Sequence, residues 1–237
     1  MPETVFAETR FGRERLAAGS VKRRHRHARG YVAVVLAGSY IEAGDEGRRR
    51  LGPGDALVHR EFDGHLDLIG RGGADVLNLP LPANRSLPIG VRVADPDAVA
   101  RAAEADPAAA SALLDTAEGT APLEDDWPDI LAAALRIRSD LRITDWAAAM
   151  GLAPATVSRG FRCVFGLSPA RYRAEMRARR AFVALTAGML PLAELALASG
   201  FADQAHLSRA IADLTGAPPS AWRRTSNSFK TTGMRPN

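Results

Sequence analysis

A short pattern of small and apolar residues constrains the C-terminal half of this chain more than any other feature. Ala147 is followed four residues later by Gly151, and six residues after that by Val157. A small residue lets two helices cross closely, and glycine can adopt the left-handed conformation of a tight turn. The apolar residue then faces back into the core. This spacing predicts two helices joined by a short turn.

The same pattern recurs about 50 residues further along the chain. Ala196 and Gly200 are again four residues apart, and Leu207 follows after seven. Two further pairs of segments match in order: Val157-Ser-Arg159 with Leu207-Ser-Arg209, and Gly166-Leu-Ser-Pro169 with Gly216-Ala-Pro-Pro219. One copy alone is compatible with an ordinary pair of antiparallel helices. Two copies indicate an internal repeat of a two-helix unit.

Charge is divided unevenly between the two halves of the chain. Residues 1–126 carry 16 basic and 20 acidic side chains, whereas residues 127–237 carry 15 and 7. A basic half beside an acidic half indicates that the basic half meets a polyanion. The alternative is a solvated basic surface without a partner.

Composition excludes several classes of protein. The 237 residues are 46% apolar, which is enough for a packed core. No apolar run approaches the roughly 20 residues that cross a bilayer, and residues 1–11 contain no signal-like hydrophobic stretch. A single cysteine allows no disulfide within the chain. We therefore expect a cytoplasmic protein with no membrane partner.

The last hundred residues or so resemble the DNA-binding domain of the AraC/XylS family. The resemblance rests on Val157-Ser158-Arg159, Phe161, Gly166, Ser168-Pro169, Tyr172, Arg177, Ala181, Gly200-Phe201, Leu207-Ser-Arg209, Gly216, Pro219 and Trp222-Arg223. It implies two helix-turn-helix motifs whose second helices enter the major groove of double-stranded DNA. It also implies a sequence-specific activator or repressor of transcription, with RNA polymerase as a further partner.

The second helix of each motif supplies the candidate DNA-binding residues. They are Ala155, Thr156, Ser158, Arg159, Arg162, Gln204, Ala205, His206 and Arg209. Arginine pairs with guanine and glutamine with adenine, so Arg159, Arg209 and Gln204 are the expected base readers. Thr156, Ser158 and Arg162 are expected at phosphates or bases. Asp213 stands where the family usually has a basic residue, which predicts a weaker second motif.

Residues 30–90 have the pattern of short strands separated by glycine turns, which predicts a small sandwich or barrel. His25-Arg-His27, Gly38, Pro53-Gly-Asp55 and His65 resemble a cupin-type sensor domain. The resemblance implies an effector or divalent metal at His25, His27 and His65. Tyr31 fills the usual carboxylate position. The alternative is a barrel that has lost its metal, and the nearby cations Lys22, Arg23, Arg24, Arg26 and Arg29 suit an anionic effector better.

These patterns together predict an α+β multidomain protein. A cupin-like sensor and dimerisation barrel spans residues 1–92, a helical connector and linker 93–126, and an all-α domain with two helix-turn-helix motifs 127–237. Asp95-Pro96 and Asp106-Pro107 predict two helix starts within the connector.

The leading function is an effector-responsive transcription regulator that forms a homodimer, and not an enzyme. One alternative is a metal-dependent cupin enzyme fused to a DNA-binding tail, against which the missing carboxylate argues. Another is a structural DNA-binding protein without an effector.

The basic C-terminal half predicts a strongly salt-dependent affinity for DNA. Each phosphate that a basic side chain neutralises releases condensed counterions, so the logarithm of the association constant should fall linearly with the logarithm of salt concentration. Fluorescence anisotropy with labelled duplex DNA at several salt concentrations measures this slope. A flat dependence would contradict phosphate contacts.

Overall fold

The computed structural model describes residues 6–81, 87–116, 118–138, 140–188 and 190–224. The chain divides into two compact units, residues 1–134 with 142–169 and residues 135–141 with 170–237. Among the described helices, none is long and apolar enough to cross a membrane.

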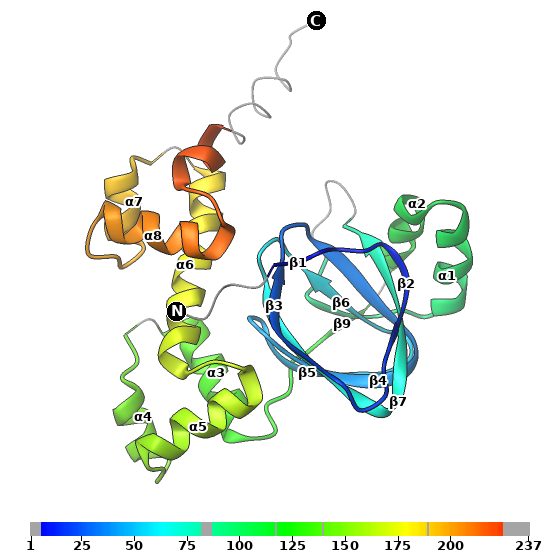
Figure 1. The fold of residues 1–237 in the computed structure, drawn as a ribbon, viewed down its shortest axis with the longest axis horizontal. Coiled ribbons are helices and arrows are strands. Elements are labelled where there is room, and N and C mark those ends of the chain that lie inside the picture. The colour runs from blue at the N-terminus through cyan, green and yellow to red at the C-terminus, as the bar shows by residue number, and fades with distance from the viewer. Residues whose placement is uncertain (1–5, 82–86, 117, 139, 189, 225–237) are drawn as a thin grey trace, which may run out of the picture. The chain divides into compact units, whose positions relative to one another are not determined.

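The first unit contains a mixed sheet of nine described strands (Figure 1). They are β1 (Phe6–Ala7), β2 (Gly12–Leu16), β3 (Val21–His27), β4 (Tyr31–Gly44), β5 (Gly47–Leu51), β6 (Asp55–His59), β7 (Gly64–Pro80), β8 (Gly90–Arg92) and β9 (Glu118–Thr120). The order is β1-β3-β7-β4-β6-β8-β9, with β2 paired to β7 and β5 to β4. The two longest strands, β4 and β7, are antiparallel neighbours.

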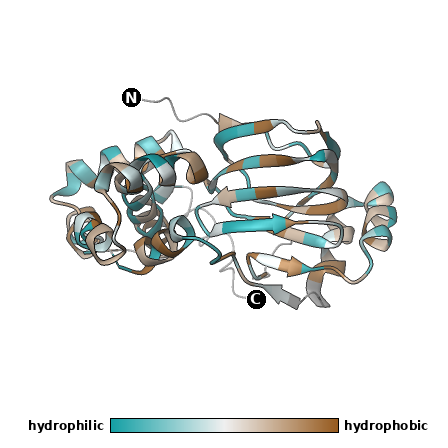
Figure 2. Cartoon of the chain, turned by 90° about the horizontal axis from the view of Figure 1, so that it is seen from below, coloured by the Kyte–Doolittle hydropathy of each residue, from teal (hydrophilic) through white to brown (hydrophobic). Residues whose placement is uncertain are grey.

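The predicted strands are confirmed, but the closed barrel is not. Among the described residues, the pairings run from β1 at one end of the sheet to β9 at the other, and none joins these ends. Figure 2 shows hydrophobic and hydrophilic stretches within single strands of this sheet. Val32 and Val34 of β4 pack in one apolar cluster and Val35 in another, so this strand buries both of its faces. A strand buried on both faces reads as a continuous apolar run.

Two short helices begin where the sequence predicts helix starts. They are α1 (Pro96–Ala105) and α2 (Pro107–Ala112). A carboxylate oxygen of Asp95 accepts a hydrogen bond from the Ala98 amide at 2.8 Å, and Asp106 caps α2 in the same way. Buried residues of this segment, namely Val99, Ala100, Ala110 and Leu114, join the apolar cluster of the sheet. The helices therefore cover a sheet of their own chain.

The acidic segment after these helices is tied to the sheet and is not a free linker. The 3-10 turn η1 (Leu113–Thr116) leads into β9, which pairs with β8. The Leu123 amide donates to the Arg48 carbonyl at 2.7 Å. The guanidinium of Arg48 then pairs with the Asp129 carboxylate at 2.9 and 2.5 Å. The acidic composition of this segment did not indicate the three-residue strand β9. Such a strand pairs through backbone groups alone and leaves no pattern in its side chains.

Six helices follow in the C-terminal half. They are α3 (Trp127–Ile137), α4 (Ile143–Ala149), α5 (Pro154–Phe165), α6 (Pro169–Ala187), α7 (Leu192–Ala198) and α8 (Gln204–Thr215). The helices α4 and α5 belong to the first compact unit, and α7 and α8 to the second.

The Arg48–Asp129 pair predicts a large effect on stability. The Asp129 side chain is 1% exposed and that of Arg48 is 20% exposed. Replacing Arg48 with alanine leaves a buried carboxylate without its partner, which typically costs about 3–5 kcal/mol. Urea unfolding followed by circular dichroism measures the loss. Arg50→Ala on the same strand, where the side chain is exposed, is the control and should change little. A loss below about 1 kcal/mol in Arg48→Ala would contradict this role.

Candidate DNA interface and sensor pocket

The first repeat of the sequence forms the helix pair α4 and α5. Ala147 of α4 and Val157 of α5 are both fully buried. Gly151 lies between the two helices with a φ of 65°, in the left-handed region that favours glycine. Pro154 begins α5, where its missing amide hydrogen costs no helical hydrogen bond.

One side of α5 is open to solvent. All five residues predicted there to bind DNA are exposed: Ala155, Thr156, Ser158, Arg159 and Arg162. Ala155, Arg159 and Arg162 are four and three residues apart, so their side chains lie along the same face of the helix. The opposite face carries Val157, Phe161 and Phe165, which are fully buried. The buried face fixes the orientation of the exposed one.

The second repeat forms the helix pair α7 and α8. Ala196 and Leu207 are fully buried, and Gly200 has a φ of 71°. Asp203 caps α8, because its carboxylate accepts a hydrogen bond from the His206 amide at 2.7 Å. The guanidinium of Arg177 lies 4.9 Å from the centre of the Phe201 ring. This cation–π contact holds the start of the turn against α6.

The residues predicted on α8 are not equally accessible. Gln204, Ala205 and Arg209 are exposed, whereas His206 is half-buried. The His206 ring meets the Phe201 ring edge-on, with 5.1 Å between their centres. Asp213 is exposed one helical turn after Arg209, so it lies on the same face.

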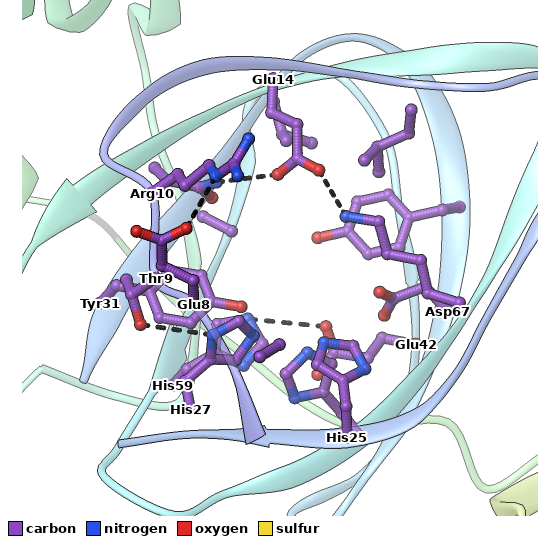
Figure 3. Close-up of a pocket in the computed structure, with 18 of the residues that line it drawn as sticks. Glu8, Thr9, Arg10, Glu14, His25, His27, Tyr31, Glu42, His59 and Asp67 are labelled. Carbon is purple, nitrogen blue, oxygen red and sulfur yellow. Dashed lines mark hydrogen bonds and ion pairs between the residues drawn. The ribbon is translucent and has the colours of Figure 1, made fainter. Parts of the chain in front are cut away.

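A cavity of about 460 Å³ lies within the sheet domain (Figure 3). Neighbouring strands supply its chemistry: β3 supplies His25 and His27, β4 supplies Tyr31, Tyr40 and Glu42, β6 supplies His59, and β7 supplies His65 and Asp67. Alternate residues of a strand point to one face, which explains the pairs on β3 and β7. On β4, Tyr31 and Glu42 are an odd number of residues apart, so a regular strand would direct their side chains to opposite faces. The register shifts between Val35 and Tyr40 allow both to face the cavity.

The structure brings together the three histidines that the sequence predicts. The ring centres of His25 and His65 are 4.3 Å apart, and those of His27 and His65 are 5.5 Å apart. Two further residues join them. The His59 ring centre lies 4.5 Å from that of His65, and the His59 Nε2 atom lies 3.6 Å from the Glu42 Oε2 atom.

The cavity also contains the Glu42 carboxylate, which the sequence analysis did not single out. Tyr31 occupies the position where the cupin resemblance expects the acid, while Glu42 reaches the same cavity from further along β4. Neither Glu42 nor His59 has a spacing signal in the sequence comparable to that of His25-Arg-His27.

Burial keeps the histidines of this cavity neutral. Desolvation lowers the pKa of His59 to about 3 and that of His27 to about 4, with a smaller contribution in each from neighbouring imidazoles. It also lowers the pKa of His65 well below its ordinary value. Neutral imidazole is the form that binds metals. Burial and the neighbouring Asp67 charge raise the pKa of Glu42, and burial raises the pKa of Asp67 to about 7.

Comparison with known proteins identifies the type of domain in the helical half of the chain. Residues 146–225 match the model of a helix-turn-helix domain. No curated protein matches the chain.

Two solved structures similar to the chain differ in how much of it they cover. The C-terminal domain of AraT, a response regulator from Geobacillus stearothermophilus, is 25% identical over 41% of this chain and 84% of that one, with a TM-score of 0.38. Unsaturated fatty acid bound ToxT from Vibrio cholerae is 9% identical over 90% and 93%, with a TM-score of 0.41. The domain match confirms the AraC resemblance of the sequence: residues 146–225 form a helix-turn-helix domain of the AraC type, and the protein is a DNA-binding transcriptional regulator.

Proposed function

We propose that this regulator reads specific DNA sequences through two helix-turn-helix motifs, α4–α5 and α7–α8, and responds to an effector in its cupin-like sheet domain. The main support for DNA reading is a feature that α5 and α8 share. Each helix buries an apolar face and exposes arginine, with hydroxyl or amide side chains beside it. An α-helix fits the major groove, where such side chains distinguish base pairs.

The proposed contacts follow from the exposed side chains. Arg159 and Arg209 can each pair with a guanine through two hydrogen bonds, and Gln204 with an adenine. Thr156, Ser158 and Arg162 are suited to phosphate oxygens, which set the position of the protein on the duplex. Ala155 and Ala205 are small enough to allow close approach to base edges. The half-buried His206 supports the turn more than it reaches outward.

The cavity of the sheet domain is the proposed effector site. Its volume of about 460 Å³ lies within the range of small-molecule pockets, which is about 300–1,000 Å³. The lining combines apolar, aromatic and ionisable groups, so it can both enclose and orient a small polar ligand. The proposal assigns residues 1–92 to this sensor, 93–126 to the connector and 127–237 to DNA binding. It places the regulator in the cytoplasm as a homodimer that meets RNA polymerase at its promoters.

Arg159→Ala should weaken specific DNA binding. Loss of a two-hydrogen-bond contact with guanine costs about 1–3 kcal/mol and relaxes base preference at one position of the site. The measurement is the Kd for an operator selected from random duplexes, at one fixed salt concentration. Arg138→Ala is the control, because Arg138 is exposed but lies outside α5 and α8. If Arg159→Ala binds the operator as tightly as the parent, α5 is not a reading helix.

Asp213→Asn should have the opposite effect. Asp213 shares a face of α8 with Arg209, so its charge repels phosphate where Arg209 attracts it. Removing this exposed negative charge should improve the free energy of DNA binding by about 0.2–1 kcal/mol, which lowers the Kd up to about fivefold. The gain should shrink as the salt concentration rises. Asp97→Asn on α1 is the control. Unchanged or weaker binding by Asp213→Asn at low salt would place α8 away from the DNA.

A further inference from the structure

Five side chains that could hold a metal ion line the cavity, and Figure 3 labels His25, His27, Glu42 and His59 among them. They form two overlapping sets, His25 with His27 and His65, and Glu42 with His59 and His65. Within each set, the potential ligand atoms all lie within 4.8 Å of one another. This spacing allows one ion to contact every member of a set after small side-chain adjustments.

Residue His65, which belongs to both sets, has an unsatisfied atom. It is 2% exposed, and its Nδ1 atom has no hydrogen-bond partner within the described part of the chain. A buried polar atom without a partner costs free energy, so such atoms are rare unless a water, an ion or a ligand satisfies them. The orphaned nitrogen therefore points to a bound species that completes the site.

The two sets differ in how well they suit a cation. Positive side chains act on both sets: Lys22 on His25 and His27, and Arg24 on His25, His65 and Glu42. Such charges repel a metal ion. Only the set of Glu42, His59 and His65 contains a carboxylate, which offsets the charge of a divalent ion, and its members are more deeply buried than His25.

The surroundings of this second set hold its ligands in place. The Tyr31 ring stacks on the His59 ring, with 4.3 Å between centres and 14° between planes. Glu42 faces Asp67 across the β4–β7 pair. Partners of this kind orient metal ligands and tune their affinity.

We propose that Glu42, His59 and His65 bind a divalent transition-metal ion such as Zn²⁺ in the cavity of the sheet domain. Two imidazoles and one carboxylate are a typical ligand set for zinc, with a fourth position left for water or a small ligand. The ligand set differs from the one that the cupin resemblance implies, because Glu42 and His59 stand outside that motif. The proposal deepens the proposed effector function, since it names the chemistry of the pocket.

Titration of the EDTA-dialysed full-length chain with Co²⁺ tests the site. Absorption of the bound ion in the visible range should saturate at one Co²⁺ per chain, and Zn²⁺ should displace it. Glu42→Gln should weaken Co²⁺ binding about tenfold or more, and so should His59→Gln. Glu14→Gln is the matched control, because Glu14 lines the same cavity but belongs to neither set. It should bind as the parent does.

Three outcomes overturn the proposal: no Co²⁺ binding by the parent, parent-like affinity in both ligand variants, or equal weakening in the Glu14→Gln control. Circular dichroism shows whether each variant folds. If Glu42→Gln does not fold, the comparison of His59→Gln with the parent decides the outcome. DNA binding of the same samples separates the two proposals. A parent that binds DNA but no metal overturns the metal site alone, whereas a parent that binds metal but no DNA overturns the proposed function.

Discussion

The sheet domain depends on the antiparallel pairing of β4 with β7. Both strands are long, and both bend where Gly38 meets Gly73. A Cβ atom at Gly38 would lie 2.1 Å from the Gly73 carbonyl oxygen, so no other residue fits this crossing. Gly38 also has a φ of 74°, which glycine adopts without strain. Because of the bend, Tyr31 before it and Glu42 after it face the same cavity, and the chemistry of the pocket follows from this backbone geometry.

Local signals were sufficient to predict the helical half. The positions of Ala147, Gly151 and Val157 define a helix, a turn and a second helix within about a dozen residues, and the second repeat does the same. Capping by Asp95 and Asp106 was equally local. The closure of the sheet could not be predicted in this way, because it depends on pairings between distant strands. The three-residue β9 was missed for the same reason.

The candidate pocket was predictable only in part. The spacing of His25 and His27 places both on one face of a strand, and His65 pairs with His25 across β3 and β7. Glu42 and His59 carry no comparable spacing signal. Glu42 reaches the cavity only because irregular pairing in β4 changes which residues face inward, and such shifts are set by long-range register. The motif therefore located three residues of the cavity, whereas Glu42 and His59 join them only through the pairing of distant strands.

A ligand bound among the buried histidines of the pocket would also lengthen the lifetime of the protein. Desolvated imidazoles and paired carboxyl groups raise the free energy of the empty sheet domain relative to an apolar interior. A ligand that satisfies them stabilises the folded chain by an amount that grows with the logarithm of ligand concentration. Proteases act on the transiently unfolded population, which shrinks as the pocket fills. The number of regulator molecules in a cell would then follow ligand supply, in addition to any change in their affinity for DNA.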